Sequence, residues 1–427
     1  MTVASLAMRG ISDAACQVSR SITHGTRADV ERINKNLSEN ERVIDLSIGT
    51  LDLSTDQYID NNLIDSIKHK SDSVHAFTPV KGLPFLREAI AGRMHRLRQD
   101  HYDPETDILV TPGGIKGAIT VTFQCLINPG DEVLIPIPNW PHYADMVKLH
   151  SGVPVFLKSP GFPQSGLCPE VLDESITPAT KIIILGDCIN PIGKVYQDSE
   201  LKAFAKIITK HNEQRKKEGM APVYVLFDCP YEAHILSNRP ISFASLLREY
   251  TIFVTGPGKT YGMHGDRIGY MCAPSSFIEV AENVQANLNS FASNYGQIAT
   301  YYALQEPMDS VAEMRARSAR ENLMAMIKSL KELDRLNVNV PEGGYFIFVD
   351  FSAYSTLMNK LGYQRADQFL LNEARVATIC GAYFAKGYNL AESLNYHVRM
   401  NCGRSDQVLH EAASRIIKSL SKCADSK

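Results

Sequence analysis

The sequence predicts an α/β fold in which a mainly parallel sheet is flanked by helices, followed by a smaller α+β part. Two observations lead to this prediction. From about residue 107 to residue 256, short apolar runs alternate with longer amphipathic segments, and strands that alternate with helices form parallel sheets covered on both faces. After about residue 300 the pattern changes to a long helical stretch, one apolar run and a final helix.

The elements can be assigned in chain order. The segment 107–114 predicts a strand that ends in a glycine turn, and 115–127 predicts the helix that follows. Further strands are expected in 131–138, 154–159, 180–187, 222–228 and 250–256, with helices in 144–152 and 199–217. A helix over 309–334 and a strand over 343–351 should follow. We therefore expect an N-terminal arm with part of a small domain (1–50), a large domain (51–300) and the rest of the small domain (301–427).

Composition excludes several classes of protein. The 427 residues are 44% apolar and 21% charged with a net charge of −3, so the chain can bury a large core but has no broad basic face for nucleic acid or an anionic membrane. No run of eighteen apolar residues predicts a membrane span. Nine cysteines are scattered without a CxxC pair or a His/Cys cluster, which indicates reduced thiols in the cytoplasm and no metal site.

The first 27 residues allow two readings. They are poor in acids and contain Arg and Ser, as organelle transit peptides do, but their density of basic residues is low. They lack the continuous apolar core of a secretory signal. An N-terminal arm that leads into a first helix is the interpretation we favour.

The stretch FVTGPGKTYGMHGDRIGY, residues 253–270, places one lysine in a glycine-rich turn. Burial there would lower the pKa of Lys259, so that its amine becomes a nucleophile for aldehydes. Gly256 and Gly258 would let a flat group approach the backbone, and Arg267 offers a two-pronged donor for a phosphate. An aldehyde-binding lysine beside a phosphate anchor is what pyridoxal phosphate requires. The stretch alone is equally compatible with an ordinary charged surface loop.

Polar residues and glycines also follow three other predicted strands. Asp228 ends one strand, where α/β folds bind ligands, and a carboxylate there would keep a pyridine nitrogen protonated. Tyr231 and Asn190 would donate hydrogen bonds to the phenolic oxygen of the same ring. The amides after VTPGG form an anion site at a helix N-terminus. Each feature alone has a plain structural reading, as a helix N-cap, an Asn-Pro turn or a generic strand–helix turn.

Together and in this order, these stretches resemble the class I/II aminotransferases of the aspartate aminotransferase superfamily, which are fold-type I pyridoxal-phosphate enzymes. The resemblance covers about residues 42–405. The matching segments are VIDLSIGTLD, HAFTPVKGLPFLREAIAGRM, NPGDEVLIPIPNWPHY, INPIG, the Asp-x-x-Tyr pair of Asp228 and Tyr231, the Lys…Gly-x-Arg-x-Gly motif of Lys259 and Arg267, PEGGYFIFVDF and HVRMNCG. Each motif is moderately specific, but all of them in order are very specific.

The resemblance implies a fold, an assembly and a set of roles. The fold would be a large domain with a seven-stranded, mainly parallel sheet and a smaller α+β domain, in a homodimer with sites at the subunit interface. The implied residues are Lys259, Asp228, Tyr231, Asn190 and Trp140 around the ring of pyridoxal 5′-phosphate, Arg267 with the amides of Gly113, Gly114 and Ile115 at its phosphate, and Gly49, Asn190 and Arg399 at the substrate. Lys259 would hold the cofactor and move the proton, and Arg399 would pair with the substrate α-carboxylate. Trp140 would stack on the ring, unless it is a core residue.

Several positions near the expected phosphate depart from the family pattern. Phe77 stands where a tyrosine is common, and Ile115, Gly256 and Gly258 stand where hydroxyl residues are common. A buried dianion needs partners for its oxygens. Either other side chains supply the missing hydrogen-bond donors, or the phosphate site is looser and more open. A third interpretation is that these substitutions are ordinary variation within the family. The candidates for compensation are Thr255, Lys116, Thr78 and His75. We expect the cofactor to be held less tightly than in typical relatives.

A second departure concerns the substrate. In the dicarboxylate enzymes of the family, an arginine lies five residues before an asparagine in a segment supplied by the partner subunit. If Asn294 is that asparagine, the arginine position is Asn289. A neutral, polar or aromatic amino donor is therefore expected rather than aspartate or glutamate. Cys229 and Pro230 inside Asp-x-x-Tyr form a third departure, which bears on the reaction type more than on the cofactor.

The predicted function is amino transfer from an α-amino acid to a 2-oxo acid. Lyases such as aminocyclopropane-carboxylate synthase, and amino-acid cyclases and oxidases, share the cofactor and the initial loss of the α-proton, so the motifs do not separate them. Regulators that use this fold usually carry an added DNA-binding domain, for which no room is expected before about residue 42. No nucleic acid or membrane partner is therefore expected.

Overall fold

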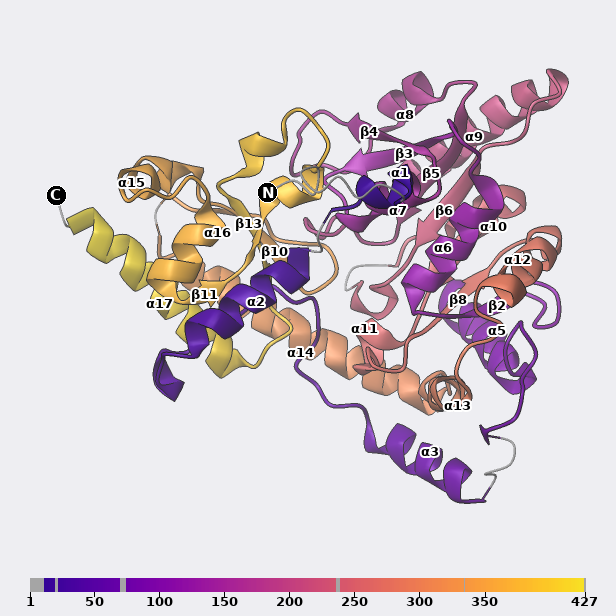
Figure 1. The fold of residues 1–427 in the computed structure, drawn as a ribbon, viewed down its shortest axis with the longest axis horizontal. Helices are drawn as coiled ribbons and strands as arrows, with labels where there is room; N and C mark the ends of the chain where they lie inside the picture. The colour runs from indigo at the N-terminus through magenta and orange to yellow at the C-terminus, as the bar shows by residue number, and fades with distance from the viewer. Residues whose placement is uncertain (1–10, 20–21, 70–73, 236–238, 334, 426–427) are drawn as a thin grey trace.

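The computed structural model describes residues 11–19, 22–69, 74–235, 239–333 and 335–425. Within them the strands form a seven-stranded, a four-stranded and a two-stranded sheet. Figure 1 shows the seven-stranded sheet among the magenta and pink helices, and the smaller sheets among the orange and yellow elements. Residues 1–10, 20 and 21 lie outside the described residues, so the two readings of the N-terminus fall partly outside them.

The seven-stranded sheet has the order β2-β8-β7-β6-β5-β3-β4. Its strands are β2 (Ile108–Pro112), β3 (Glu132–Ile137), β4 (Val153–Lys158), β5 (Thr180–Gly186), β6 (Tyr224–Asp228), β7 (Thr251–Thr255) and β8 (Ile268–Cys272). β8 runs antiparallel to β2 and β7, whereas the other neighbours are parallel. The predicted mainly parallel seven-stranded sheet is confirmed. β8 was not predicted, because the glycines and charges of its motif interrupt the apolar pattern before it.

Helices cover both faces of this sheet. They are α5 (Pro84–Arg98), α6 (Ile115–Leu126), α7 (His142–Leu149), α8 (Pro169–Ser175), α9 (Asp198–Lys217), α10 (Phe243–Leu246), α12 (Ser275–Leu288) and α13 (Asn294–Ala303). Successive strand residues alternate between two apolar clusters, as the period of a strand requires. Leu109 belongs to the cluster that contains residues of α6 and α12, whereas Val110 belongs to the cluster that contains residues of α5 and α9. The ends of the parallel strands are thereby fixed between two helical layers.

The smaller sheets belong mainly to the C-terminal part. The four-stranded sheet has the order β12-β13-β10-β9, made by β9 (Asn337–Val338), β10 (Phe346–Asp350), β12 (Ile379–Cys380) and β13 (His397–Asn401). The helices packed with it include α15 (Ser355–Lys360), α16 (Ala366–Phe369) and α17 (Asp406–Asp425). β1 (Ile44–Asp45) pairs with β11 (Val376–Ala377), which brings an N-terminal segment to this part. The predicted late strand and the final helix are confirmed.

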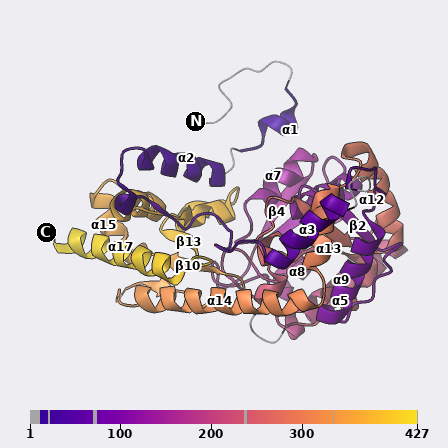
Figure 2. The ribbon, with the colours of Figure 1, turned by 90° about the horizontal axis from the view of Figure 1, so that it is seen from below.

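The long helix α14 (Pro307–Leu330) links the two parts of the molecule. Figure 2 shows it running beneath both the large sheet and the small sheets. It confirms the predicted helix, while the domain limits at residues 50 and 300 stay a prediction. The remaining helices are α1 (Asp13–Cys16), α2 (Ile22–Asn34), α3 (Gln57–His69) and α11 (Gly258–Tyr261). None of the helices in the described ranges combines the length and apolar character needed to cross a bilayer.

Candidate active site

A cavity of about 440 Å³ lies at the C-terminal ends of β5, β6 and β7. Phe346 of β10 and Arg399 of β13 line it from the small sheet. The site residues expected from the sequence converge here: the cavity is lined by Gly49, Gly114, Ile115, Trp140, Asn190, Asp228, Tyr231, Lys259, Arg267 and Arg399. Gly113 is absent from the lining and lies just behind it, where its carbonyl accepts a hydrogen bond from Arg267. The fold therefore brings together residues that are up to 350 positions apart, Gly49 and Arg399.

Lys259 projects from α11, which begins three residues after β7 ends. Its Nζ atom donates a hydrogen bond to the Gly49 carbonyl, which also accepts one from the Tyr345 hydroxyl at 3.2 Å. Burial, together with the Arg399 guanidinium, lowers the pKa of Lys259 to about 8. A Cβ atom at position 49 would lie 3.0 Å from Cζ of Phe346, so glycine keeps the space in front of the lysine open.

Asp228, the last residue of β6, has one satisfied and one unsatisfied carboxylate oxygen. Oδ2 accepts a hydrogen bond from the Tyr143 hydroxyl, whereas Oδ1 is buried and has no hydrogen-bond partner among the described residues. Burial raises the pKa of Asp228 to about 6. A buried carboxylate oxygen without a donor is unfavourable. The protonated ring nitrogen of pyridoxal phosphate is a donor of the kind that this oxygen requires, so the site fits the cofactor.

Arg399 is held by Asn190 and by the segment that leads to Gly49, both of which are expected at the site. Its Nη1 donates to Oδ1 of Asn190 at 3.1 Å, and its Nη2 donates to the Ser47 carbonyl at 2.6 Å. The guanidinium also lies 4.2 Å from the ring centroid of Phe346. Because Oδ1 of Asn190 is occupied, its amide nitrogen is the group left to donate into the cavity.

Arg267 joins the glycine loop after β2 to the lysine segment. Its Nη1 donates to the His264 carbonyl at 3.3 Å, and its Nη2 donates to the Gly113 carbonyl. In return, its own carbonyl accepts the N–H of Gly114 at 2.8 Å. That N–H is not available to a phosphate in this arrangement, contrary to what the sequence suggested. The N–H of Ile115, at the first position of α6, has no acceptor within the helix and remains a suitable donor.

The four candidates for compensating donors lie in different places. The Thr255 hydroxyl donates to the Cys229 carbonyl at 2.7 Å and is used there. His75 lies outside the cavity lining, where its ring contacts the Tyr295 hydroxyl at 3.1 Å, and Thr78 is outside the lining too. Lys116 does line the cavity, and its Nζ lies 5.1 Å from the ring centroid of Trp140. Lys116 thus brings a basic side chain into the cavity, although position 289 carries none.

Tyr143 and His264 are two of the cavity residues that the sequence did not indicate. Tyr143, which contacts Asp228, lies in the first turn of α7, three residues after Trp140. Its position three residues after Trp140 is a weak signal in the sequence, but only the fold shows that its hydroxyl reaches Asp228 at the end of β6. His264, five residues after Lys259, also lines the cavity. The sequence gives it no signal beyond its place inside the lysine motif.

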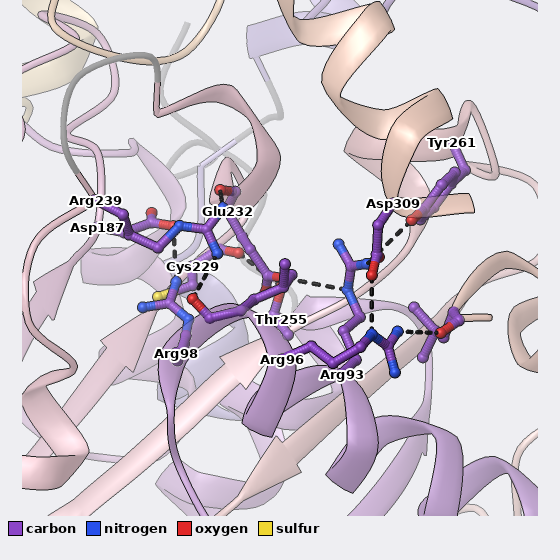
Figure 3. Close-up of polar contacts among 12 residues, drawn as sticks. Arg93, Arg96, Arg98, Asp187, Cys229, Glu232, Arg239, Thr255, Tyr261 and Asp309 are labelled. Atoms are coloured by element: carbon purple, nitrogen blue, oxygen red, sulfur yellow. Dashed lines mark hydrogen bonds and ion pairs between the residues drawn. The ribbon is translucent and has the colours of Figure 1, made fainter. Parts of the chain in front are cut away.

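A layer of mostly buried charges, drawn in Figure 3, joins the segments that carry the site. Arg93 of α5 donates to Glu232 at 3.1 Å and to the Tyr261 hydroxyl at 3.2 Å. Glu232 follows Tyr231, and Tyr261 lies two residues after Lys259, so this arginine connects the two segments. Arg93 and Arg96 also bind Asp309 in the first turn of α14.

A second buried pair lies in the same layer. Arg98 and Asp187 are 3.5 Å apart, and both side chains are almost fully buried. Asp187 comes directly after β5 and three residues before Asn190. Burial raises the pKa of Asp187 to about 7. This pair anchors the third segment of the site to α5.

Comparison with known proteins agrees with this geometry. A family model described as "Aminotransferase class I and II" matches residues 41–416. The chain belongs to this family. It is 30% identical over 388 residues to a probable aspartate/prephenate aminotransferase of Aquifex aeolicus, over 88% of this chain and 91% of the relative. It is 31% identical over 381 residues to an aspartate aminotransferase of Bacillus sp., over 88% and 90% of the two chains. The structure of the aspartate aminotransferase from Thermus thermophilus with maleate has a TM-score of 0.83 at 26% identity, and the match covers 96% of this chain and 100% of that one.

The chain is therefore a pyridoxal-phosphate-dependent aminotransferase that acts on amino acids and 2-oxo acids. The fold class and the cofactor expected from the sequence are confirmed. The comparisons do not favour the lyase, cyclase or oxidase activity that the motifs had left open.

Proposed function

We propose that the cavity performs amino transfer with the roles that its geometry supports. The observation that carries this proposal is the unpartnered Oδ1 of Asp228 in one cavity with Lys259 and Arg399. When bound, pyridoxal phosphate supplies an aldehyde and an electron-poor ring that stabilises negative charge at the substrate α-carbon. Lys259 holds the aldehyde carbon, Asp228 keeps the ring nitrogen protonated, and Trp140 covers the ring face.

The remaining residues orient the substrate and the ring. Arg399, fixed by the Asn190 and Ser47 contacts, presents its guanidinium to the substrate α-carboxylate. The Asn190 amide nitrogen and the Tyr231 hydroxyl donate to the phenolic oxygen of the ring. The Lys259 amine would move the proton at the substrate α-carbon, and its lowered pKa favours the neutral form that this role needs. Arg267 and the Ile115 N–H hold the phosphate.

For the amino donor, we propose a neutral, polar or aromatic side chain. Asn289, at the end of α12, is exposed and carries no charge where an arginine would bind a side-chain carboxylate. The apolar residues Ile48, Ile189 and Phe346 line the cavity and provide surface for such a side chain.

A dicarboxylic donor is the second candidate, and one observation favours it. Lys116 brings a cation into the cavity, over Trp140. The relatives in Aquifex and Bacillus are named for aspartate. If Lys116 binds a side-chain carboxylate, Lys116→Gln should reduce kcat/KM for aspartate at least about tenfold and leave kcat/KM for a neutral donor unchanged.

The experiment that tests the function is a donor panel with quantified products. Purified enzyme loaded with the cofactor is mixed with single amino acids, and the 2-oxo acid formed is measured, followed by recovery of the starting spectrum with a second 2-oxo acid. Stoichiometric and reversible transfer is expected. Release of ammonia or of another leaving group without reversible transfer would contradict the proposal. A preference for aspartate over every neutral donor would contradict the proposed neutral, polar or aromatic donor, but not the proposed amino transfer.

A homodimer is the assembly that we propose. Phe77 is 92% exposed and packs edge-on against Phe291, with ring centroids 5.6 Å apart. His75 and Tyr295 lie in the same two segments. A large aromatic side chain so fully exposed favours burial by a partner. Light scattering should give twice the chain mass, and Phe77→Glu should shift the mass towards one chain.

We also propose a cytoplasmic location. The eight cysteines within the described residues are all free, as expected for a reducing compartment. Fractionation of cells that express the tagged protein would test this directly.

A further inference from the structure

The phosphate end of the cavity, formed by Arg267 and the glycine loop at Gly113 and Gly114, contains a histidine without an assigned role. His264 lines the cavity, and its carbonyl accepts a hydrogen bond from Nη1 of Arg267 at 3.3 Å. Its ring atom Nε2 is buried and has no hydrogen-bond partner among the residues that the structure describes. A buried ring nitrogen therefore lies unsatisfied beside the residue that anchors the phosphate.

The space for this imidazole exists because position 258 is glycine. A Cβ atom at Gly258 would lie 3.3 Å from Nδ1 of His264, which is a tight contact. At Gly256, a Cβ atom would lie 2.8 Å from the Ile268 carbonyl oxygen and 3.4 Å from Cγ1 of Ile115. Glycine at 258 therefore makes room for His264, whereas glycine at 256 is required by the nearby Ile268 carbonyl.

The phosphate has few donors without this residue. Arg267 supplies a two-pronged guanidinium and Ile115 an N–H, but the Gly114 N–H is already used by the Arg267 carbonyl. The Thr255 hydroxyl is used by the Cys229 carbonyl. A phosphate dianion has more acceptor sites than these donors fill, and the buried Nε2 of His264 is a polar atom that still needs a partner at this end of the cavity.

We propose that Nε2 of His264 donates a hydrogen bond to the phosphate of pyridoxal 5′-phosphate and replaces hydroxyl donors that Gly256, Gly258 and Ile115 cannot provide. The proposal needs the cofactor, but it does not depend on the amino donor. It differs from compensation by Lys116, whose ammonium group lies over Trp140.

The surroundings define what kind of donor His264 is. Burial and the cations Lys259 and Arg267 lower the pKa of His264 to about 4, so at pH 7 its ring is neutral in the protein without the cofactor. A neutral imidazole donates from one nitrogen only. Glutamine can place an amide N–H at a reach similar to that of Nε2, so it is the conservative replacement, whereas alanine removes the donor.

The test compares two ligands that differ only in the phosphate. Dissociation constants of pyridoxal 5′-phosphate and of pyridoxal are measured by equilibrium titration of the full chain freed of cofactor. His264→Ala should weaken binding of the phosphorylated ligand at least about tenfold and leave that of pyridoxal unchanged, because a hydrogen bond to a charged group is lost. His264→Gln should restore most of the affinity. The matched control is His142→Ala, a histidine in the same cavity beside Trp140, which should change both constants equally.

Two results would overturn the proposal. One is an unchanged affinity of His264→Ala for pyridoxal 5′-phosphate, and the other is an equal weakening for both ligands, which would indicate a packing role. Gly258→Ala is a second test that keeps the histidine, because the added Cβ, 3.3 Å from Nδ1, forces the imidazole to shift and should selectively weaken binding of the phosphorylated ligand. If His264→Ala does not fold, Gly258→Ala decides: selective weakening supports the proposal, and wild-type affinity overturns it.

Discussion

The Tyr143 hydroxyl donates a hydrogen bond to Oδ2 of Asp228, which links the first turn of α7 to the end of β6. This contact favours the ionised carboxylate, because it lowers the pKa of Asp228 against the larger effect of burial, which raises it. The ionised form is the one that keeps the cofactor ring nitrogen protonated. Tyr143 is therefore a positioning residue that acts through Asp228.

Removal of this hydroxyl should shift the acid side of the pH profile. In Tyr143→Phe the pKa of Asp228 rises further, so we expect kcat to fall about tenfold at neutral pH and the acid limb of kcat to move to higher pH. The matched control is Tyr196→Phe, since Tyr196 lines the same cavity but its hydroxyl accepts from the Leu167 N–H at 3.0 Å. Identical acid limbs in the two variants would show that the Tyr143 contact does not tune Asp228.

Two glycines of the lysine motif should respond differently to the same substitution. A Cβ atom at Gly269 would overlap the backbone of Gly114, whereas a Cβ atom at Gly265 would meet no atom within 4 Å. Gly269→Ala should therefore separate β8 from the glycine loop and abolish cofactor binding. Gly265→Ala should bind the cofactor like the wild type. Cofactor content and thermal unfolding measured for both variants check this, and equal retention would mean that the loop moves without cost.

Replacing Arg98 and replacing Asp187, the two members of a buried pair, should have unequal effects on the free energy of unfolding. Arg98→Met should lower the free energy of unfolding by about 3–5 kcal/mol, because it leaves buried carboxylates without a cation. Asp187→Asn should cost much less, since burial already raises the pKa of Asp187 to about 7. In Asp187→Asn, Arg98 also retains its cation–π contact with Phe253, because the guanidinium carbon lies 4.7 Å from the ring centroid. Urea unfolding of both variants is the measurement, and a larger loss for Asp187→Asn would reverse this account.

The phosphate site should still be weaker than in relatives with hydroxyl donors. If His264 supplies a single hydrogen bond, it does not replace every donor that Gly256, Gly258 and Ile115 lack. We expect pyridoxal 5′-phosphate to leave this enzyme during long dialysis faster than it leaves the aspartate aminotransferase of Bacillus sp. treated in parallel. Full retention by both proteins would show that the site is as complete as in that relative.

The sequence predicted six of the seven strands of the large sheet, all but β8. The expected site residues follow strands or lie in motifs whose order is specific, and ten of them line one cavity. The sequence could not predict contacts that depend on the path of distant segments. The Tyr143–Asp228 bond joins α7 to β6, and the Gly114 N–H is occupied by the carbonyl of Arg267, a residue with a left-handed backbone and a φ of 56°. Arg93 and Arg98 resemble solvent-facing charges of an amphipathic helix, yet both are buried against carboxylates.

His234 should make the protein sensitive to acid. Its side chain is 1% exposed, neither ring nitrogen has a hydrogen-bond partner in the described part of the chain, and its ring packs against Tyr345 with centroids 5.0 Å apart. Burial lowers the pKa of His234 to about 4. Between pH 4 and about pH 6.5, the folded state therefore binds fewer protons at this site than the unfolded state, and this site's contribution to stability falls as the pH decreases through that range.

His234→Phe should remove this dependence, because phenylalanine fills a similar volume and does not titrate. The free energy of unfolding of the variant relative to the wild type should rise by about 3 kcal/mol between pH 7 and pH 4. Asp187 and Asp228 change stability in the opposite direction, since their raised pKa values make the folded state bind more protons, but they are common to both proteins and cancel in the difference. The exposed His101, replaced in the same way, is the control. A pH-independent difference between wild type and His234→Phe would mean that His234 finds a proton-accepting partner in solution.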